Sequence, residues 1–240
     1  MNNKYKVFKK IPIRGSILNS LAVVVGTFLG IQFGSFLDKD LKTIAISGLA
    51  LLLIGVGSKM FFSSKNMLSV AMSISLGGLI GKIIGIDVWM HDLAESARQT
   101  LGEGDQFANG FLTTSILYCV GPIALMGCAQ EGLRGKIELL SIKSVLDFVF
   151  SLFFAATLGA GVYLTALFLL IFQSALTMLA KVVRPLIKGE VPVGDMNGIG
   201  GLILFSIAIN LLGLKSVHTE CFMPAFFFVL IFSKLLKNFS

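Results

Sequence analysis

Charged side chains are scarce in this chain of 240 residues: only 14% are Asp, Glu, Lys or Arg, whereas 55% are hydrophobic. The mean hydropathy is +0.88. A soluble domain of this length needs many more charges to cover its surface, so the composition excludes a soluble globular protein. Long apolar runs recur over the whole length and leave no room for a folded domain outside the membrane. The sequence therefore predicts one all-α integral membrane domain, a polytopic transmembrane helix bundle over residues 1–240.

Cysteine and histidine are also few. The three cysteines, Cys119, Cys128 and Cys221, lie in apolar stretches and are odd in number, which argues against a disulfide framework. The two histidines, His91 and His218, have no cluster of ligands near them in the sequence, so we expect no metal site and no cofactor. Because no phosphate loop, zinc-protease motif or nucleophile elbow occurs either, an enzyme is not expected.

The net charge of +7 comes from basic residues in short segments between apolar runs. With the N-terminus inside the cell, fifteen Lys and Arg fall on the inner side and five on the outer side. This bias follows the positive-inside rule. It predicts that both termini, including the basic tail of residues 1–15, are cytoplasmic. The partner of these charges is then the lipid bilayer rather than a nucleic acid.

Eight apolar runs are long enough to be membrane spans of about 20 residues. They cover residues 16–36, 43–60, 67–86, 108–127, 141–160, 161–181, 197–214 and 221–236. The first run is too long for the apolar part of a signal peptide, which has about 7–15 residues, so we expect it to be retained. Residues 141–181 would form a helix of about 60 Å, twice the hydrocarbon thickness, so a tight turn is predicted at 159–161.

The longest loop, residues 87–107, has the pattern of an amphipathic helix. Val88, Trp89, Leu93, Ala97 and Leu101 fall roughly on one helical face. Such a helix would lie at the outer membrane interface, with the tryptophan at the headgroup level, or would form a short cap over the bundle.

Glycine recurs every fourth residue in two of the spans. The first span has Gly26, Gly30 and Gly34, and the third has Gly77, Gly81 and Gly85. Small residues at this spacing allow helix backbones to approach closely, so we expect them to be helix-packing residues.

A weak internal repeat relates the two ends of the chain. Residues 46–51 (ISGLAL) resemble residues 199–204 (IGGLIL), and Asn19-Ser20 falls opposite Gln173-Ser174 when one gap is allowed. Spans 1–3 would then correspond to spans 6–8. Since the offset of five spans is odd, the two halves would have inverted orientation, as in many secondary transporters.

The fourth span contains the dipeptide Gly121-Pro122, followed by Gln130 and Glu131 in the predicted loop. Proline removes a helical hydrogen bond and clashes with the preceding turn, so the helix should kink or break there. Broken helices form substrate and ion sites in transporters, although a simple proline kink is an equally good interpretation.

Two ionisable residues, Lys143 and Asp147, lie one helical turn apart in the fifth span. An ionisable group there costs on the order of 2.5–3.5 kcal/mol, so Asp147 should face the bundle interior and have a partner. The alternatives are a site for a substrate or an ion, with Glu131 nearby, or an interfacial salt bridge near the inner surface.

Several uncharged polar residues complete the candidate binding set. They are Asn19, Gln173, Asn210 and Thr114. Each could bond a neighbouring helix or point into a polar pathway. Together they predict a polar interior surface.

Three stretches carry a family resemblance: residues 15–30 (GSILNSLAVVVGTFLG), 111–133 (FLTTSILYCVGPIALMGCAQEGL) and 142–162 (IKSVLDFVFSLFFAATLGAGV). With them, the chain resembles the bacterial membrane proteins filed as domain of unknown function 554, over nearly its whole length. The family pattern usually has Gln-Asp-Gly where this chain has Gln130-Glu131-Gly132. The resemblance implies an integral protein of the bacterial inner membrane, of presumed transport type.

The leading hypothesis is a secondary transporter of a small solute or ion, and the alternatives are a channel or a non-transporting scaffold. Its partners would be the bilayer and that solute, and self-association into a homo-oligomer is left open. The polar pair in the fifth span and the broken helix carry this hypothesis.

Overall fold

The computed structural model describes residues 13–101, 104, 106–119, 122–180 and 190–236. Its elements are α1 (Arg14–Gly34), α2 (Lys39–Phe62), α3 (Met67–Ile84), α4 (Ile86–Leu101), α5 (Gln106–Cys119), α6 (Pro122–Arg134), α7 (Glu138–Leu158), α8 (Gly161–Met178), α10 (Glu190–Leu211), the 3-10 helix η1 (Thr219–Phe222) and α11 (Ala225–Leu235). No strand occurs in these ranges, so the predicted all-α class is confirmed.

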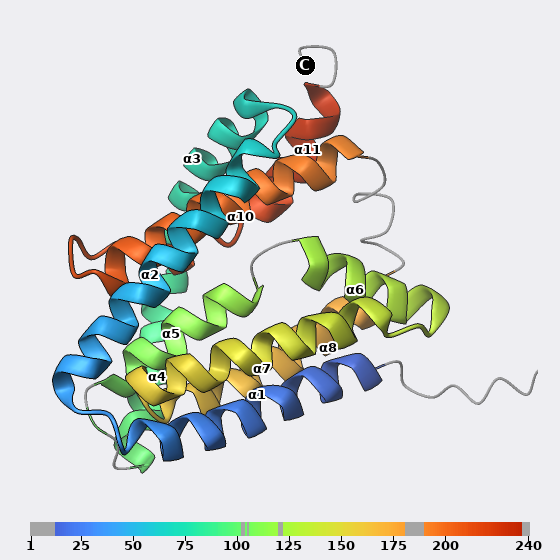
Figure 1. Cartoon of the computed structure of the whole chain (residues 1–240). Helices are drawn as coiled ribbons and strands as arrows, with labels where there is room; N and C mark the ends of the chain where they lie inside the picture. Colours follow the sequence, from blue (N-terminus) through green and yellow to red (C-terminus); the bar gives the residue numbers. More distant parts are fainter. Residues whose placement is uncertain (1–12, 102–103, 105, 120–121, 181–189, 237–240) are drawn as a thin grey trace, which may run out of the picture.

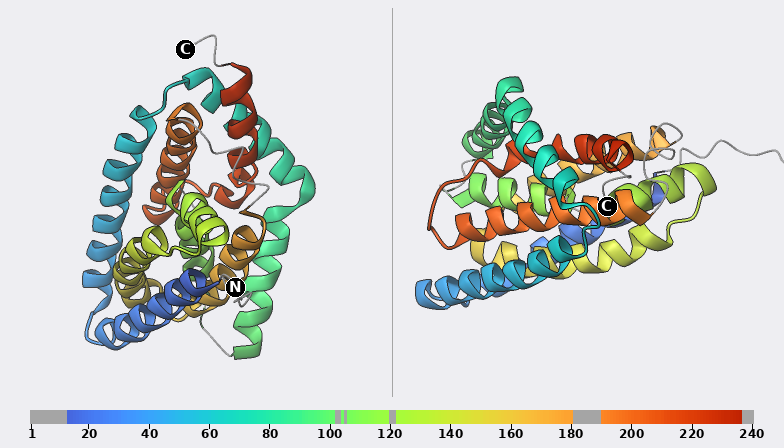
Figure 2. Two further views of the ribbon diagram at one scale, coloured as in Figure 1. Left: turned by 90° about the vertical axis from the view of Figure 1, so that its right-hand side faces the viewer. Right: turned by 90° about the horizontal axis from the view of Figure 1, so that it is seen from above.

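The helices form two bundles (Figures 1 and 2). The first bundle contains α1, α5, α6, α7 and α8, and the second contains α2, α3, α10 and α11 with η1. The bundles meet where α2 packs against α7 and where α10 approaches α5 and α6. Amphipathic α4 joins them at one end, in contact with α5, α8 and η1.

Local signals in the sequence explain where several helices begin and end. The side chains of Asp38 and Asn66 accept hydrogen bonds from the backbone at the starts of α2 and α3, as N-caps do. Gly159 ends α7 within the predicted turn at 159–161. Its φ is +80°, a backbone conformation that glycine adopts readily because it has no side chain.

The packing glycines of the first span lie against the backbone of α7. A Cβ atom on Gly26 would clash with the carbonyl oxygen of Phe148, and one on Gly30 would clash with that of Leu152. Gly34 repeats this contact one turn later. Because the contacts advance in step along both helices, α1 and α7 run in the same direction.

In the second bundle, Gly77 and Gly81 lie against the backbone of Ala225 and Cys221 in the same way. Gly85 was wrongly grouped with them. It adopts a φ of +77°, ends α3, and has no atom within 4 Å of the position of a Cβ. Gly85 follows the last residue of α3, and its role is to adopt the positive φ at which the helix ends.

Within the described residues, six helices are long and apolar enough to cross a membrane: α1, α2, α3, α7, α8 and the part of α10 from Val193 to Leu211. The predicted fourth span is two helices, α5 and α6, which meet at 62°. The predicted eighth span is shorter, with η1 and α11 together forming an apolar helix over Thr219–Ser233. Because α1 and α7 are parallel, the chain must cross the membrane an odd number of times between them. This agrees with a chain in which α5 and α6 together make one crossing. Eight crossings stay a prediction.

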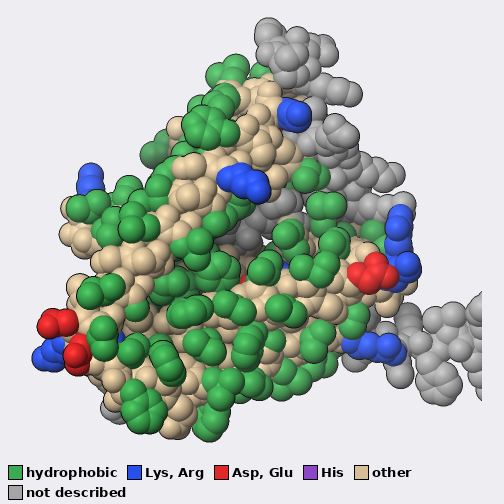
Figure 3. Space-filling model, in the orientation of Figure 1, with side chains coloured by type: hydrophobic (Ala, Val, Ile, Leu, Met, Phe, Trp, Pro, Cys, Tyr) green, Lys and Arg blue, Asp and Glu red, His purple; other side chains and the backbone are tan. Residues whose placement is uncertain are grey.

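Apolar side chains cover the lengths of the helices on the face drawn in Figure 3, and charged side chains gather toward the helix ends. Large residues such as Phe28, Leu79 and Ile171 are more than half exposed. Such a surface would aggregate in water, whereas it matches the hydrocarbon of a bilayer.

The predicted amphipathic helix of the longest loop is present as α4. Met90 and Ala94 pack inward, whereas Val88, Trp89 and Leu101 are exposed. The helix starts directly after Gly85, and Lys82 forms an ion pair with the buried Asp87 in its first turn.

The helices of the predicted repeat are direct neighbours. α1 packs on α8, α2 on α10, and α3 on α11. Gly57 and Gly201 approach each other reciprocally where α2 crosses α10. Pairs of this kind are expected around a two-fold axis, and the inverted repeat itself stays a prediction.

Candidate functional site

A buried polar cluster lies where α7 meets α1 and α5. The Lys143 ammonium donates to both oxygens of Asp147, at 2.8 and 2.6 Å, and the side-chain amide of Asn19 donates to the same carboxylate at 2.9 Å. The ammonium also lies 5.6 Å from the ring centre of Tyr118, whose hydroxyl bonds Ser151 at 2.7 Å. The carboxylate is therefore fully hydrogen-bonded, with its charge balanced by one cation.

This cluster is deeper in its helix than the sequence predicted. The helix begins at Glu138 rather than residue 141, so Asp147 lies nine residues from its start and eleven from its end at Leu158. The side chains of Lys143 and Asp147 are 7% and 5% exposed. The predicted ion pair is present, with Asp147 near the middle of the helix and Lys143 in its first third, and its depth relative to the membrane surface stays a prediction.

Lys143 and Asp147 line a cavity of about 250 Å³ between the two bundles, which we call the pair cavity. Its remaining wall is mostly apolar and comes from α2, α5, α6 and α10, with Asn197 as a further polar side chain. A cavity with apolar walls and a few convergent polar groups is the usual form of a small-molecule site.

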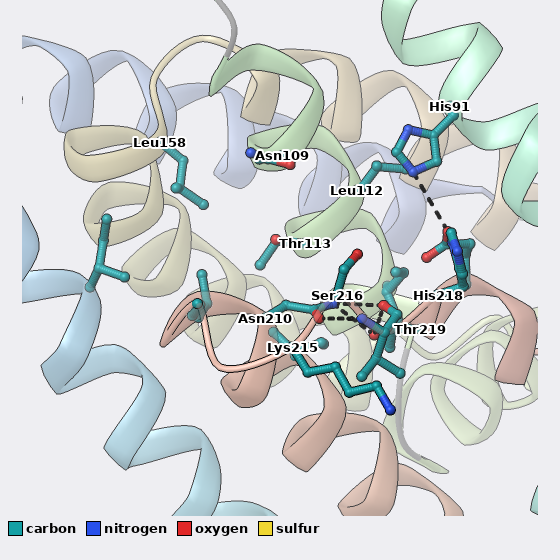
Figure 4. A pocket seen from close by; sticks show the side chains of 17 residues that line it. His91, Asn109, Leu112, Thr113, Leu158, Asn210, Lys215, Ser216, His218 and Thr219 are labelled. Atoms are coloured by element: carbon teal, nitrogen blue, oxygen red, sulfur yellow. Dashed lines mark hydrogen bonds and ion pairs between the residues drawn. The ribbon is translucent and has the colours of Figure 1, made fainter.

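A second cavity of about 440 Å³ lies between the same bundles, near the loop that follows α10. We call it the histidine cavity, because His91 and His218 are in its wall (Figure 4). It is also lined by Asn109, Thr113 and Asn210. It is the more polar of the two sites.

The two cavities share helices α2, α5, α7 and α10 but no lining residue. On α10, Ile207 lines the histidine cavity and Leu204, one turn away, lines the pair cavity. On α5, Ile116 lines the histidine cavity and Leu117 lines the pair cavity. On α2, the buried Ala50 lies between the residues that line the two cavities. These five residues belong to one hydrophobic core cluster and are called the apolar layer.

Glu131 and Gln130 lie in α6 rather than in a loop, and neither bonds to the central pair. Glu131 is 2% exposed and accepts a hydrogen bond from the Gly15 backbone N–H at 2.9 Å, so it caps the start of α1. Gln130 accepts from the backbone of Leu139 at the start of α7. Both residues are helical because α6 continues to Arg134, and their side chains bond to the starts of α1 and α7.

The other predicted polar residues divide between different places. Gln173 is fully buried in α8, and neither atom of its amide has a hydrogen-bond partner among the described residues. Thr114 bonds Thr165 at 2.6 Å and ties α5 to α8. Asn210 holds the backbone of Val217 by two bonds of 2.8 Å and lines the histidine cavity. One continuous polar surface through all four amide and hydroxyl residues is therefore not formed.

Pro122 begins α6, and Gly121 lies outside the described residues. The position of the break agrees with the sequence prediction, because proline is favoured in the first turn of a helix and disfavoured in its interior. Nearby Ile123 and Ala124 line the pair cavity, so the break adjoins the candidate site.

Sequence reasoning missed Asp195, which is fully buried in α10. It accepts hydrogen bonds from the Ser64 and Ser233 hydroxyls and from the backbone N–H groups of Lys65 and Asn66, at 2.6 to 3.0 Å. It fixes the start of α3 to α10 and α11. The predicted seventh span began at residue 197 and left Asp195 in a loop, so no signal pointed to this role.

The expectation that the two histidines lack nearby ligands was also wrong. His91 on α4 and His218 before η1 approach the buried carboxylate of Glu220 at 3.8 and 3.4 Å. Two segments that are far apart in the sequence bring them together, α4 and residues 218–220.

The sequence comparisons agree with this architecture. The family described as "Protein of unknown function (DUF554)" matches residues 14–234. The chain is 24% identical over 215 residues to "Uncharacterized membrane protein YdfK" of Bacillus subtilis (strain 168), covering 88% of this chain and 91% of that protein. It is 25% identical over 217 residues to "Uncharacterized protein YqgA" of Escherichia coli (strain K12), covering 88% and 92%. No solved structure matches.

The match over most of the chain confirms the resemblance seen in residues 15–30, 111–133 and 142–162. The printed name of the first relative and the six apolar helices agree that the protein is embedded in a membrane. The chain belongs to the DUF554 family of membrane proteins.

Proposed function

We propose that the protein is a secondary carrier of a small solute or ion in the bacterial inner membrane, with its central site in the pair cavity. The observation that carries this proposal is the pair of cavities on either side of the apolar layer, between the same two bundles. Alternating access needs two such openings and a barrier between them. Rocking of the first bundle against the second would close one opening as the other widens.

The depth of Asp147 supports a central binding role. At 1.5 Å per residue it lies about 13 Å from one end of α7 and about 16 Å from the other. In a helix that crosses a hydrocarbon core of about 30 Å, this position is near the midplane, where carriers hold their substrates.

The chemistry of the pair sets what the site can bind. A proton or a cation would compete with Lys143 for Asp147, and an anionic group would compete with Asp147 for Lys143. Either event leaves the other member of the pair without its partner, so binding would require a rearrangement of the site that compensates the displaced charge. The amide oxygen of Asn19 has no partner among the described residues and is a ready acceptor for a ligand.

A non-transporting scaffold is the second candidate. The mutual satisfaction of Lys143 and Asp147 favours it, because such a pair is complete without a ligand. A channel is less favoured, since the apolar layer separates the cavities. The carrier proposal involves no catalysis, no cofactor and no nucleic acid.

Reconstitution into liposomes tests the proposal. A panel of ions and small solutes is screened for uptake by the wild type and by the double variant Lys143→Met with Asp147→Asn, which removes both charges together. We expect one solute class to enter with the wild type and uptake to fall at least tenfold in the double variant. The control is Glu138→Gln, an exposed carboxylate of the same helix. Lack of uptake of every solute, with no ligand-dependent change in melting temperature, would contradict a carrier.

A further inference from the structure

Three polar side chains converge at one edge of the histidine cavity (Figure 4). They are His91 on α4, His218 just before η1, and Glu220 within η1, and their ligand atoms all lie within 4.8 Å of one another. The Glu220 Oε1 atom lies 3.4 Å from His218 Nδ1 and 3.8 Å from His91 Nε2. Imidazole nitrogen and carboxylate oxygen are the ligand types that Zn²⁺ and similar cations take in proteins.

These separations fit the edges of a coordination tetrahedron. With metal–ligand bonds of about 2.0–2.2 Å, two ligands of a tetrahedral site lie about 3.4 Å apart. The two edges from Glu220 are already at or near that length. Rotation of the half-exposed His91 ring would shorten the third edge, which is at most 4.8 Å, to the same length.

The carboxylate of Glu220 is the observation that points to a ligand. Its side chain is only 5% exposed, and Oε1 accepts no hydrogen bond from any described residue. A buried carboxylate oxygen without a partner costs several kcal/mol, so such groups are normally paired with a cation or a donor. A cation held by the two imidazoles would occupy the side of Oε1 that faces them.

The segment that carries His218 and Glu220 is held rigidly. The amide of Asn210 bonds the backbone of Val217 in both directions, and the Thr219 hydroxyl bonds Ser206 on α10 at 2.5 Å. Fixed ligands favour metal binding because less conformational entropy is lost when the site fills.

A second carboxylate lies behind the cluster. Asp87 Oδ2 is 3.9 Å from His218 Nδ1, the nitrogen that also faces Glu220, and this carboxyl accepts a hydrogen bond from Lys82. It adds a further carboxylate beside the cluster, which favours a cation there.

We propose that His91, His218 and Glu220 form a binding site for a divalent transition-metal cation such as Zn²⁺ at the mouth of the histidine cavity. The inference stands apart from the proposed transport, because binding at this site can be measured without any flux.

Binding of Zn²⁺ to the purified, detergent-solubilised full-length protein tests the site. The protein carries no histidine tag, is stripped with a chelator, and is titrated with Zn²⁺ in competition with a fluorescent indicator. We expect one ion per chain with a Kd below about 10 μM, and a loss of affinity of at least about tenfold in His218→Gln and in Glu220→Gln. Cobalt supplies a second measurement, since Co²⁺ in a four-coordinate site of this kind absorbs visible light far more strongly than the hydrated ion.

The matched control is Asp92→Asn, an exposed carboxylate next to His91 that lies outside the cluster. It should bind Zn²⁺ like the wild type. The metal-free melting temperatures of the variants show whether each is folded, and His91→Gln, at a half-exposed position, supplies a variant with little structural cost. Lack of saturable binding by the wild type would overturn the proposal. Equal binding by the wild type and all three cluster variants would show an adventitious ion only and would overturn it as well.

Discussion

At the scale of single residues, the main feature is the enclosed Lys143–Asp147 ion pair. Each charge is enclosed, and each is stabilised by the other and by Asn19 or Tyr118. Loss of one partner of a buried pair leaves the other charge without compensation, whereas loss of both often costs much less. This asymmetry provides a way to separate structure from function.

We expect Asp147→Asn alone to lower the free energy of unfolding by about 3–5 kcal/mol, because the Lys143 ammonium would remain buried without a counter-charge. The double variant Lys143→Met with Asp147→Asn should recover most of that loss. Thermal unfolding in detergent measures both.

The matched control is Glu138→Gln, which breaks an exposed pair with Lys136 and should change stability by less than about 0.5 kcal/mol. A double variant as unstable as the single one would show that the pair is not the source of the effect.

The spacing of Lys143 and Asp147 was enough to predict their contact, because residues four apart share a helical face. The contact with Asn19 spans 128 positions and has no local signal. Glu131 was expected to meet Asp147 from the loop after the kinked span, yet it caps α1. The histidines show the same limit: His91 and His218 become neighbours only through the packing of α4 on η1.

At the scale of elements, glycine spacing determines how the helices pack. Gly26 and Gly30 place α1 directly on the backbone of α7, and Gly77 and Gly81 place α3 on the η1–α11 segment. Close backbone contact gives dispersion energy that longer side chains would prevent, and in a bilayer this energy replaces the hydrophobic drive between helices.

We expect Gly30→Leu to destabilise the protein by at least about 2 kcal/mol, since the new side chain would have to displace the backbone of α7 at Leu152. Gly48→Leu on α2 is the matched control. No atom lies within 4 Å of its Cβ position, and leucine favours the helix more than glycine does, so stability should be unchanged or slightly higher. Melting temperatures compare the two. Equal destabilisation by both would argue against the α1–α7 contact.

Periodicity and composition predicted the long apolar helices and the turn at Gly159, because these depend on local signals. The break between α5 and α6 followed from a single proline. The start of α10 at Glu190 was missed, since Pro192, Gly194 and Asp195 resemble a loop, whereas the hydrogen bonds of Asp195 to the start of α3 stabilise the helix there.

At the scale of the whole molecule, the two bundles meet along the apolar layer, with one cavity on each side. The sequence predicted polar residues at both levels but not that they would divide between two cavities. That division depends on how α2 and α10 cross α5 and α7, and only the tertiary structure shows it. We propose that the apolar layer is the barrier that opens alternately to either side of the membrane.

The most direct test of this central claim is the two-sided reactivity of a cysteine placed in the layer. Cys119, Cys128 and Cys221 are buried and would be replaced by alanine. Leu204→Cys is then exposed, in sealed vesicles of either orientation, to a maleimide that cannot cross the bilayer. Ala166→Cys, which is equally buried in α8 but lines neither cavity, is the control. Our account predicts that Cys at 204 reacts from both sides and Cys at 166 from neither. Reaction of Leu204→Cys from one side only, or from neither side, would contradict alternating access.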